Sequence, residues 1–128
     1  MFTLRLCESP VRCVQNSRLA LETPHAVPRW GLRAGKYVVQ ATANAPEDGA
    51  NSFFLNIDAE PQDPQMIWDL PLTSGSETRT VSWRGNGTFD NNQFVPQVFN
   101  LAAGPHQLIL RGREANTLLQ DLTVVLYP

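Results

Sequence analysis

Tryptophan and asparagine side chains stand out in this 128-residue chain, because several fall where the sequence predicts loops or strand ends. A flat indole packs against the C–H face of a sugar ring, and amide groups hydrogen-bond its hydroxyls in fixed directions. The indoles are Trp68 and Trp83, and the amides are Asn51, Asn86, Asn91, Asn92 and Asn116. These residue types predict a carbohydrate-binding surface. A buried core position is the open alternative for each tryptophan.

Trp83 is the better candidate of the two indoles. Strict alternation from Val81 points the Trp83 side chain toward the core. The segment Gly85-Asn86-Gly87 follows at once, however, and is expected to end the strand. We therefore expect Trp83 to overhang the rim of the fold and line a loop pocket. If Trp83 is a core residue instead, Trp68 takes this role.

Catalytic chemistry has weaker support. A loose acidic group could frame a glycosidase-like pair of carboxylates, although solvated loop carboxylates are the favoured interpretation. The group consists of Asp58, Glu60, Asp63 and Asp69. His25 and His106 adjoin no nucleophile motif, and the chain contains no G-x-S-x-G and no glycine-rich phosphate loop. We therefore expect a protein that is not an enzyme.

The two cysteines, Cys7 and Cys13, could face each other across a hairpin. Two reduced thiols are the favoured interpretation, because one pair does not make a disulfide framework. His25 and His106 are the only histidines, so a structural zinc site is disfavoured.

The elements that must position these side chains are predicted to be short strands, because apolar and polar residues alternate with a period of two. Ten prolines and eight glycines divide the chain, and apolar residues alternate with polar ones between them. The predicted strands cover residues 2–6, 37–44, 53–58, 81–84, 95–101, 106–111 and 118–127. Strands of this length and spacing predict an all-β fold, an antiparallel β-sandwich or a jelly roll. We expect one domain over residues 1–128, with at most one short helical turn.

The expected core follows from the same alternation. It comprises Leu4, Leu6, Tyr37, Val39, Phe53, Leu55, Ile57, Leu108, Leu110, Leu122 and Val124.

Charge and composition limit the classes of binding partner that the chain is expected to have. Ten basic and twelve acidic residues give a net charge of −2, so the basic face that nucleic-acid binding needs is not expected. Charged residues make up only 17% of the chain, but no stretch predicts a membrane span. Residues 1–15 contain Arg5 and Arg12 and no long apolar run, so they do not predict a signal peptide. This favours a cytoplasmic protein or an excised module.

Four short segments occur in a distinctive order. They are Ala34-Gly35-x-Tyr37, Asn51-Ser52-Phe53-Phe54, Ala103-Gly104-x-His106-x-Leu108 and Arg113-Glu114-x-x-Thr117-x-Leu119-x-Asp121. Over residues 34–126, the chain resembles the carbohydrate-binding modules of families 6 and 35 and the related malectin-like domains. The resemblance implies a jelly-roll sandwich with a lectin-like sugar site among the loops at one end.

By position, the resemblance makes Trp83 and Asn116 the first candidates for sugar contacts. Trp68, Asn51, Arg113 and Glu114 come next. For Arg113 and Glu114 an internal ion pair that pins the last turn is an equally open interpretation.

The resemblance also raises the question of calcium. Many members of this group hold a structural calcium with an N-terminal E-x-E pattern and an aspartate on the last strand. Asp121 matches the aspartate and Glu8 the second glutamate, but Leu6 stands at the first position. Calcium takes six to eight oxygen ligands, so a missing carboxylate weakens such a site. We expect no required cofactor, with calcium as the open alternative.

The expected function is non-catalytic binding of a polysaccharide or glycan through tryptophan stacking and hydrogen bonds from Asn, Arg and Glu. The alternative is a stand-alone interaction or oligomerisation domain that keeps the sandwich but has lost the sugar site. The resemblance suggests a secreted protein, whereas residues 1–15 do not predict a signal peptide.

Overall fold

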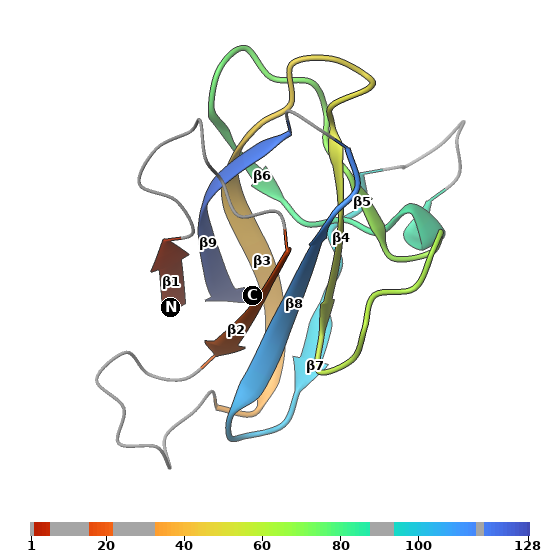
Figure 1. The fold of residues 1–128 in the computed structure, drawn as a ribbon. Helices are drawn as coiled ribbons and strands as arrows, with labels where there is room; N and C mark the ends of the chain where they lie inside the picture. The colour runs from red at the N-terminus through yellow and green to blue at the C-terminus, as the bar shows by residue number, and fades with distance from the viewer. Residues whose placement is uncertain (1, 6–15, 22–32, 88–93, 115–116) are drawn as a thin grey trace.

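Two antiparallel sheets make up the fold (Figure 1). The computed structural model describes residues 2–5, 16–21, 33–87, 94–114 and 117–128. One sheet has the order β1 (Phe2–Arg5), β9 (Leu118–Leu126), β3 (Gly35–Asn44) and β6 (Glu77–Thr80), with β7 (Phe99–Leu101) also paired to β3. The other has the order β2 (Asn16–Leu21), β8 (His106–Gly112), β4 (Ser52–Ile57) and β5 (Ile67–Asp69). The all-β antiparallel prediction is confirmed, and the jelly-roll connection pattern stays a prediction.

The core lies between the sheets and follows the predicted alternation. In β3, Val39 and Ala41 are buried and pair with Val124 and Leu122 of β9, whereas Gln40 between them is partly exposed. The predicted core residues in the described part of both sheets are all buried: Tyr37, Val39, Phe53, Leu55, Ile57, Leu108, Leu110, Leu122 and Val124. Leu6 and the side chain of Leu4 lie outside what the structure describes.

The segment around Trp83 differs from the prediction. The expected strand over residues 81–84 is replaced by an isolated bridge between Ser82 and Pro96 and a 3-10 helix, η1 (Arg84–Asn86). This is the one helical turn in the described residues. The expected strand over 95–101 shortens to β7, because Pro96 has no N–H to donate to a sheet.

Three strand ends meet at one end of the second sheet. β4 begins with Ser52, which pairs with Asp69 at the end of β5. On the other side of β4, Phe53 pairs with Gly112, the last residue of β8. The chain segments that precede β4 and follow β5 and β8 therefore converge in space, although they lie far apart in the sequence (Figure 1). No helix among the described residues is long and apolar enough to cross a membrane.

Candidate functional site

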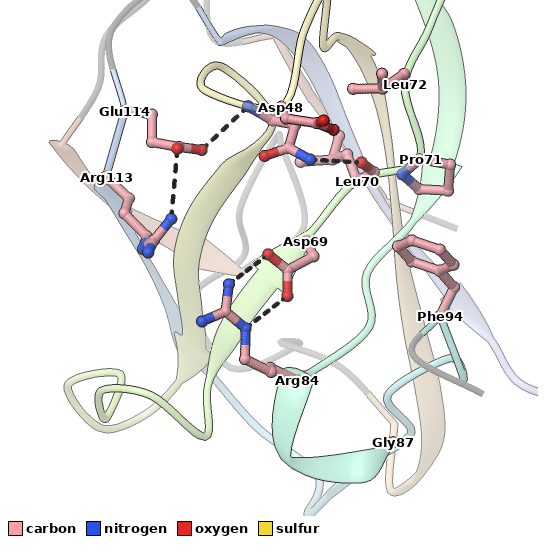
Figure 2. Close-up of a pocket in the computed structure, with 11 residues that line it drawn as sticks. Asp48, Asp69, Leu70, Pro71, Leu72, Arg84, Gly87, Phe94, Arg113 and Glu114 are labelled. Carbon is pink, nitrogen blue, oxygen red and sulfur yellow. Dashed lines mark hydrogen bonds and ion pairs between the residues drawn. The ribbon is translucent and has the colours of Figure 1, made fainter. Parts of the chain in front are cut away.

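An open pocket of about 610 Å³ lies where these three strand ends meet (Figure 2). Its lining combines three kinds of side chain. The carboxylates are Asp48, Asp69 and Glu114, and the guanidiniums are Arg84 and Arg113. The apolar part is formed by Leu70, Pro71, Leu72 and Phe94. Figure 2 shows Arg113 and Glu114 on one side of the pocket, with Pro71, Leu72 and Phe94 on the other.

A bidentate ion pair between Arg84 and Asp69 forms one wall. Asp69 follows the buried Trp68 in β5, so alternation turns its carboxylate away from the core. Nε of Arg84 donates to Oδ2 at 2.8 Å, and Nη2 donates to Oδ1 at 2.7 Å. These hydrogen bonds raise the pKa of the Arg84 guanidinium, and partial burial opposes them less strongly. The pairing fixes the plane of the guanidinium and leaves Nη1 without a partner among the described residues.

A second polar network joins the start of β4 to the residues that follow β8. Oε1 of Glu114 accepts from the backbone N–H of Asn51 at 3.1 Å and from the buried hydroxyl of Ser52 at 2.5 Å. Nη1 of Arg113 donates to the same hydroxyl at 2.8 Å and lies 3.5 Å from Oε2 of Glu114. The ion pair between Arg113 and Glu114, one of the two interpretations left open for these residues, is present, and both residues also line the pocket.

The side-chain amide of Asn51 belongs to this network. The oxygen and nitrogen of this amide are best satisfied when the nitrogen donates to Oε1 of Glu114 at 3.1 Å and to the Asp48 carbonyl at 2.9 Å. In the opposite orientation, the nitrogen reaches only the Leu70 carbonyl, at 3.4 Å. We adopt the first orientation because it gives the nitrogen two acceptors. Asn51, Arg113 and Glu114 are thus predicted site residues that the fold brings together.

The expectation that Trp68 stacks on a ligand is wrong. Trp68 has no exposed surface and packs in the core against Phe53, with ring centroids 6.0 Å apart. Strand β5 pairs Trp68 with Phe53 of β4, and paired residues point to the same face of a sheet. The core alternative, which the sequence left open, therefore holds for this tryptophan.

Trp83 is also held against the core. Its side chain packs on the core cluster, and its ring meets Phe99 edge to face, with centroids 5.4 Å apart. Nε1 donates a 2.8 Å hydrogen bond to the Leu55 carbonyl. The ring does not line the pocket, although the next residue, Arg84, does. These contacts favour a packing role for Trp83 over the expected place in a loop pocket.

Several other predicted residues lie elsewhere. Asn91, Asn92, Asn116 and Glu8 fall outside the described residues, as do Cys7 and Cys13. Asp121 lies in β9, paired with Arg5 of β1 on one side and Thr42 of β3 on the other. No group of three or more potential metal-ligating side chains occurs in the described parts of the chain. The calcium site stays a prediction.

Two carboxylates of the acidic group considered for catalysis, Asp58 and Glu60, are each engaged by a basic side chain. Asp58 contacts His106, with Oδ2 2.5 Å from Nδ1, and Glu60 is 3.1 Å from Arg111. Nε2 of His106 faces the Ala102 carbonyl at 2.6 Å, so acceptors stand at both ring nitrogens. Burial lowers the pKa of His106, but the hydrogen bonds to Ala102 and Asp58 outweigh burial, and the pKa is raised. These contacts tie the end of β4 to the start of β8.

Sequence reasoning missed Phe94, Leu72, Arg84 and Asp48 as site residues. Phe94 and Leu72 are exposed apolar side chains, which the sequence could signal only by their place beside polar loop residues.

No protein-family model and no curated protein sequence matches this chain. The resemblance to carbohydrate-binding modules therefore stays a prediction that rests on the segments quoted above.

Proposed function

We propose that this chain is a non-catalytic carbohydrate-binding domain whose sugar site is the pocket between Phe94 and Arg84. One observation carries the proposal. A single pocket of suitable size for a sugar combines an exposed aromatic ring with hydrogen-bonding groups that are already fixed in place. Sugars need both features, because their C–H faces are apolar and their rims are polar.

Phe94 takes the place that the sequence assigned to the tryptophans. Its side chain is 45% exposed, and Leu72, 48% exposed, extends the apolar surface beside it. A sugar ring packed on this surface removes apolar area from water on both partners. Arg84 then donates to hydroxyls through Nη1, while Asp69 holds its orientation. The fixed orientation reduces the entropy that binding would otherwise cost.

Two matched aromatic substitutions test the proposal. Phe94 and Tyr127 are almost equally exposed, at 45% and 46%, but only Phe94 lines the pocket. We expect Phe94→Ala to weaken glycan binding by about fivefold or more, since aromatic contacts contribute ~1 kcal/mol beyond burial. Tyr127→Ala should leave the affinity unchanged. The assay is affinity electrophoresis against soluble polysaccharides. Equal effects of the two variants, or no binding to any polysaccharide by the unchanged chain, would contradict the proposal.

A second candidate function is an interaction or oligomerisation domain. It is favoured by the packing of Trp68 and Trp83, which removes the tryptophan platform that the resemblance implied. It is also favoured by the neighbouring exposed apolar residues Phe94 and Val95. Sedimentation velocity over a range of concentrations separates the two candidates. Self-association that Phe94→Ala abolishes, together with no glycan binding, would support the second.

A further inference from the structure

The charges that line the pocket do not balance. The carboxylates of Asp48, Asp69 and Glu114 outnumber the guanidiniums of Arg84 and Arg113, which leaves one excess negative charge. A ligand that carries negative charge therefore enters an unfavourable field, whereas a cationic ligand is attracted.

Among the residues that the structure describes, the charged side chains nearest the pocket lining do not reverse this excess. The Arg79 guanidinium donates to the Leu72 carbonyl behind the apolar wall, but Glu77 lies 3.6 Å from it and offsets its charge. The pKa of Arg84 is raised by the hydrogen bonds to Asp69 and, to a smaller extent, by the negative charge of Asp63, so Asp63 adds to the negative charge near the pocket.

Both guanidiniums in the pocket are already engaged with carboxylates. Two donors of Arg84 bind Asp69, and Nη1 of Arg113 lies between Ser52 and Glu114. An acidic sugar would have to compete with these carboxylates for the arginines. The desolvation of a ligand carboxylate would then be poorly compensated.

Asp48 differs from the other two carboxylates. It is exposed and lies in a tight turn that is closed by a 2.9 Å hydrogen bond from the Ala50 N–H to the Glu47 carbonyl. Its side chain forms no hydrogen bond or ion pair with any other residue that the structure describes. It is therefore the carboxylate in the pocket lining whose acceptor oxygens are available to a ligand.

We propose that the ligand of this pocket is an amino sugar, a glycan with a protonated amine, and that Asp48 is the specificity-determining residue that pairs with this amine. The inference rests on the proposed function and deepens it. The apolar wall takes the C–H face of the ring, and the excess negative charge selects the ammonium form. Exposed ion pairs weaken with ionic strength, so the preference falls as salt is added.

Three oligosaccharides of equal length test the inference. They are a β-1,4-linked N-acetylglucosamine hexamer, its deacetylated glucosamine counterpart with protonated amines, and a galacturonate hexamer. Isothermal titration of the full chain at low salt should give the tightest binding for the deacetylated hexamer and the weakest for the galacturonate. Equal or tighter binding of the N-acetylated or acidic hexamer would overturn the inference but leave the proposed function standing. No binding to any glycan, including the polysaccharides used above, would overturn both.

Asp48→Asn and Glu47→Gln provide the matched pair of variants. Each removes one exposed carboxylate from the same turn, but only Asp48 lines the pocket. We expect Asp48→Asn to weaken binding of the deacetylated hexamer by about fivefold, as for one exposed ion pair. Binding of the N-acetylated hexamer should change little, and Glu47→Gln should leave both affinities unchanged. If the two variants weaken binding equally, the effect is one of net charge, and the assignment of Asp48 is overturned.

Discussion

Replacing Trp83 by Ala should destabilise the fold rather than act on ligand binding alone. The ring contributes an edge-to-face contact with Phe99, which is worth about 1 kcal/mol beyond its burial. Its hydrogen bond to the Leu55 carbonyl contributes about 1 kcal/mol, and the lost apolar burial of this partly exposed side chain adds about another. The expected fall in the free energy of unfolding is therefore about 3 kcal/mol.

Thermal and urea denaturation measure this change. For a domain of this size, 1 kcal/mol corresponds to about 4 °C in Tm, so Trp83→Ala should lower Tm by about 12 °C. Trp83→Phe keeps a ring beside Phe99 but leaves the Leu55 carbonyl without its indole donor. This variant should lose about 1–2 kcal/mol and keep its glycan affinity. A Tm within about 3 °C of the parent, accompanied by a loss of glycan binding, would refute the packing role and restore Trp83 to the sugar site.

Two further predictions concern ion pairs. The raised pKa of His106 means that its contribution to stability is fully present below the unfolded value of 6.5 and is lost as the pH rises through the higher folded value. Urea titrations at pH 5.5 and pH 8.5 should show this decrease in the parent, and Asp58→Asn should reduce it; an unchanged dependence in that variant would contradict the role of Asp58. Asp69→Asn removes the bidentate partner of Arg84, so affinity for the galacturonate hexamer should rise in calorimetric titrations. A lower affinity of this variant for the galacturonate hexamer would show that Asp69 does not keep the Arg84 guanidinium from binding an anionic ligand.

The long central strands were predictable because burial imposes a period of two on the sequence, whereas β2, β5 and β6 were not predicted. In β3, Val39, Ala41 and Ala43 are buried and the residues between them are partly exposed. The polarity of each residue therefore indicates which face of the sheet its side chain occupies. The same alternation pointed Trp83 toward the core. The turn residues that follow do end the extended segment, at η1, but the partly exposed ring still packs against the core cluster, as the alternation indicates.

The site was only partly predictable because it depends on which strands pair. Asn51, Arg113 and Glu114 were predicted, and the pairing of β4 with β8 brings them together. Arg84 meets Asp69 because η1 packs beside the end of β5, and no local pattern around either residue indicates that contact. Phe94 was missed for a related reason, since an exposed ring beside a polar loop has no periodic signature.

The hydrogen bond from Trp83 to Leu55 also affects how the sheet ends. β5 has only three residues, so its pairing with β4 stops at Phe54 and leaves Leu55 next to an open edge. An open edge with unpaired N–H and C=O groups can recruit a strand from another molecule and start aggregation. Here the indole occupies the Leu55 carbonyl, and the Leu55 N–H reaches the Met66 carbonyl at 3.4 Å. A tryptophan that the sequence suggested for ligand binding thus closes this stretch of β4 to an incoming strand.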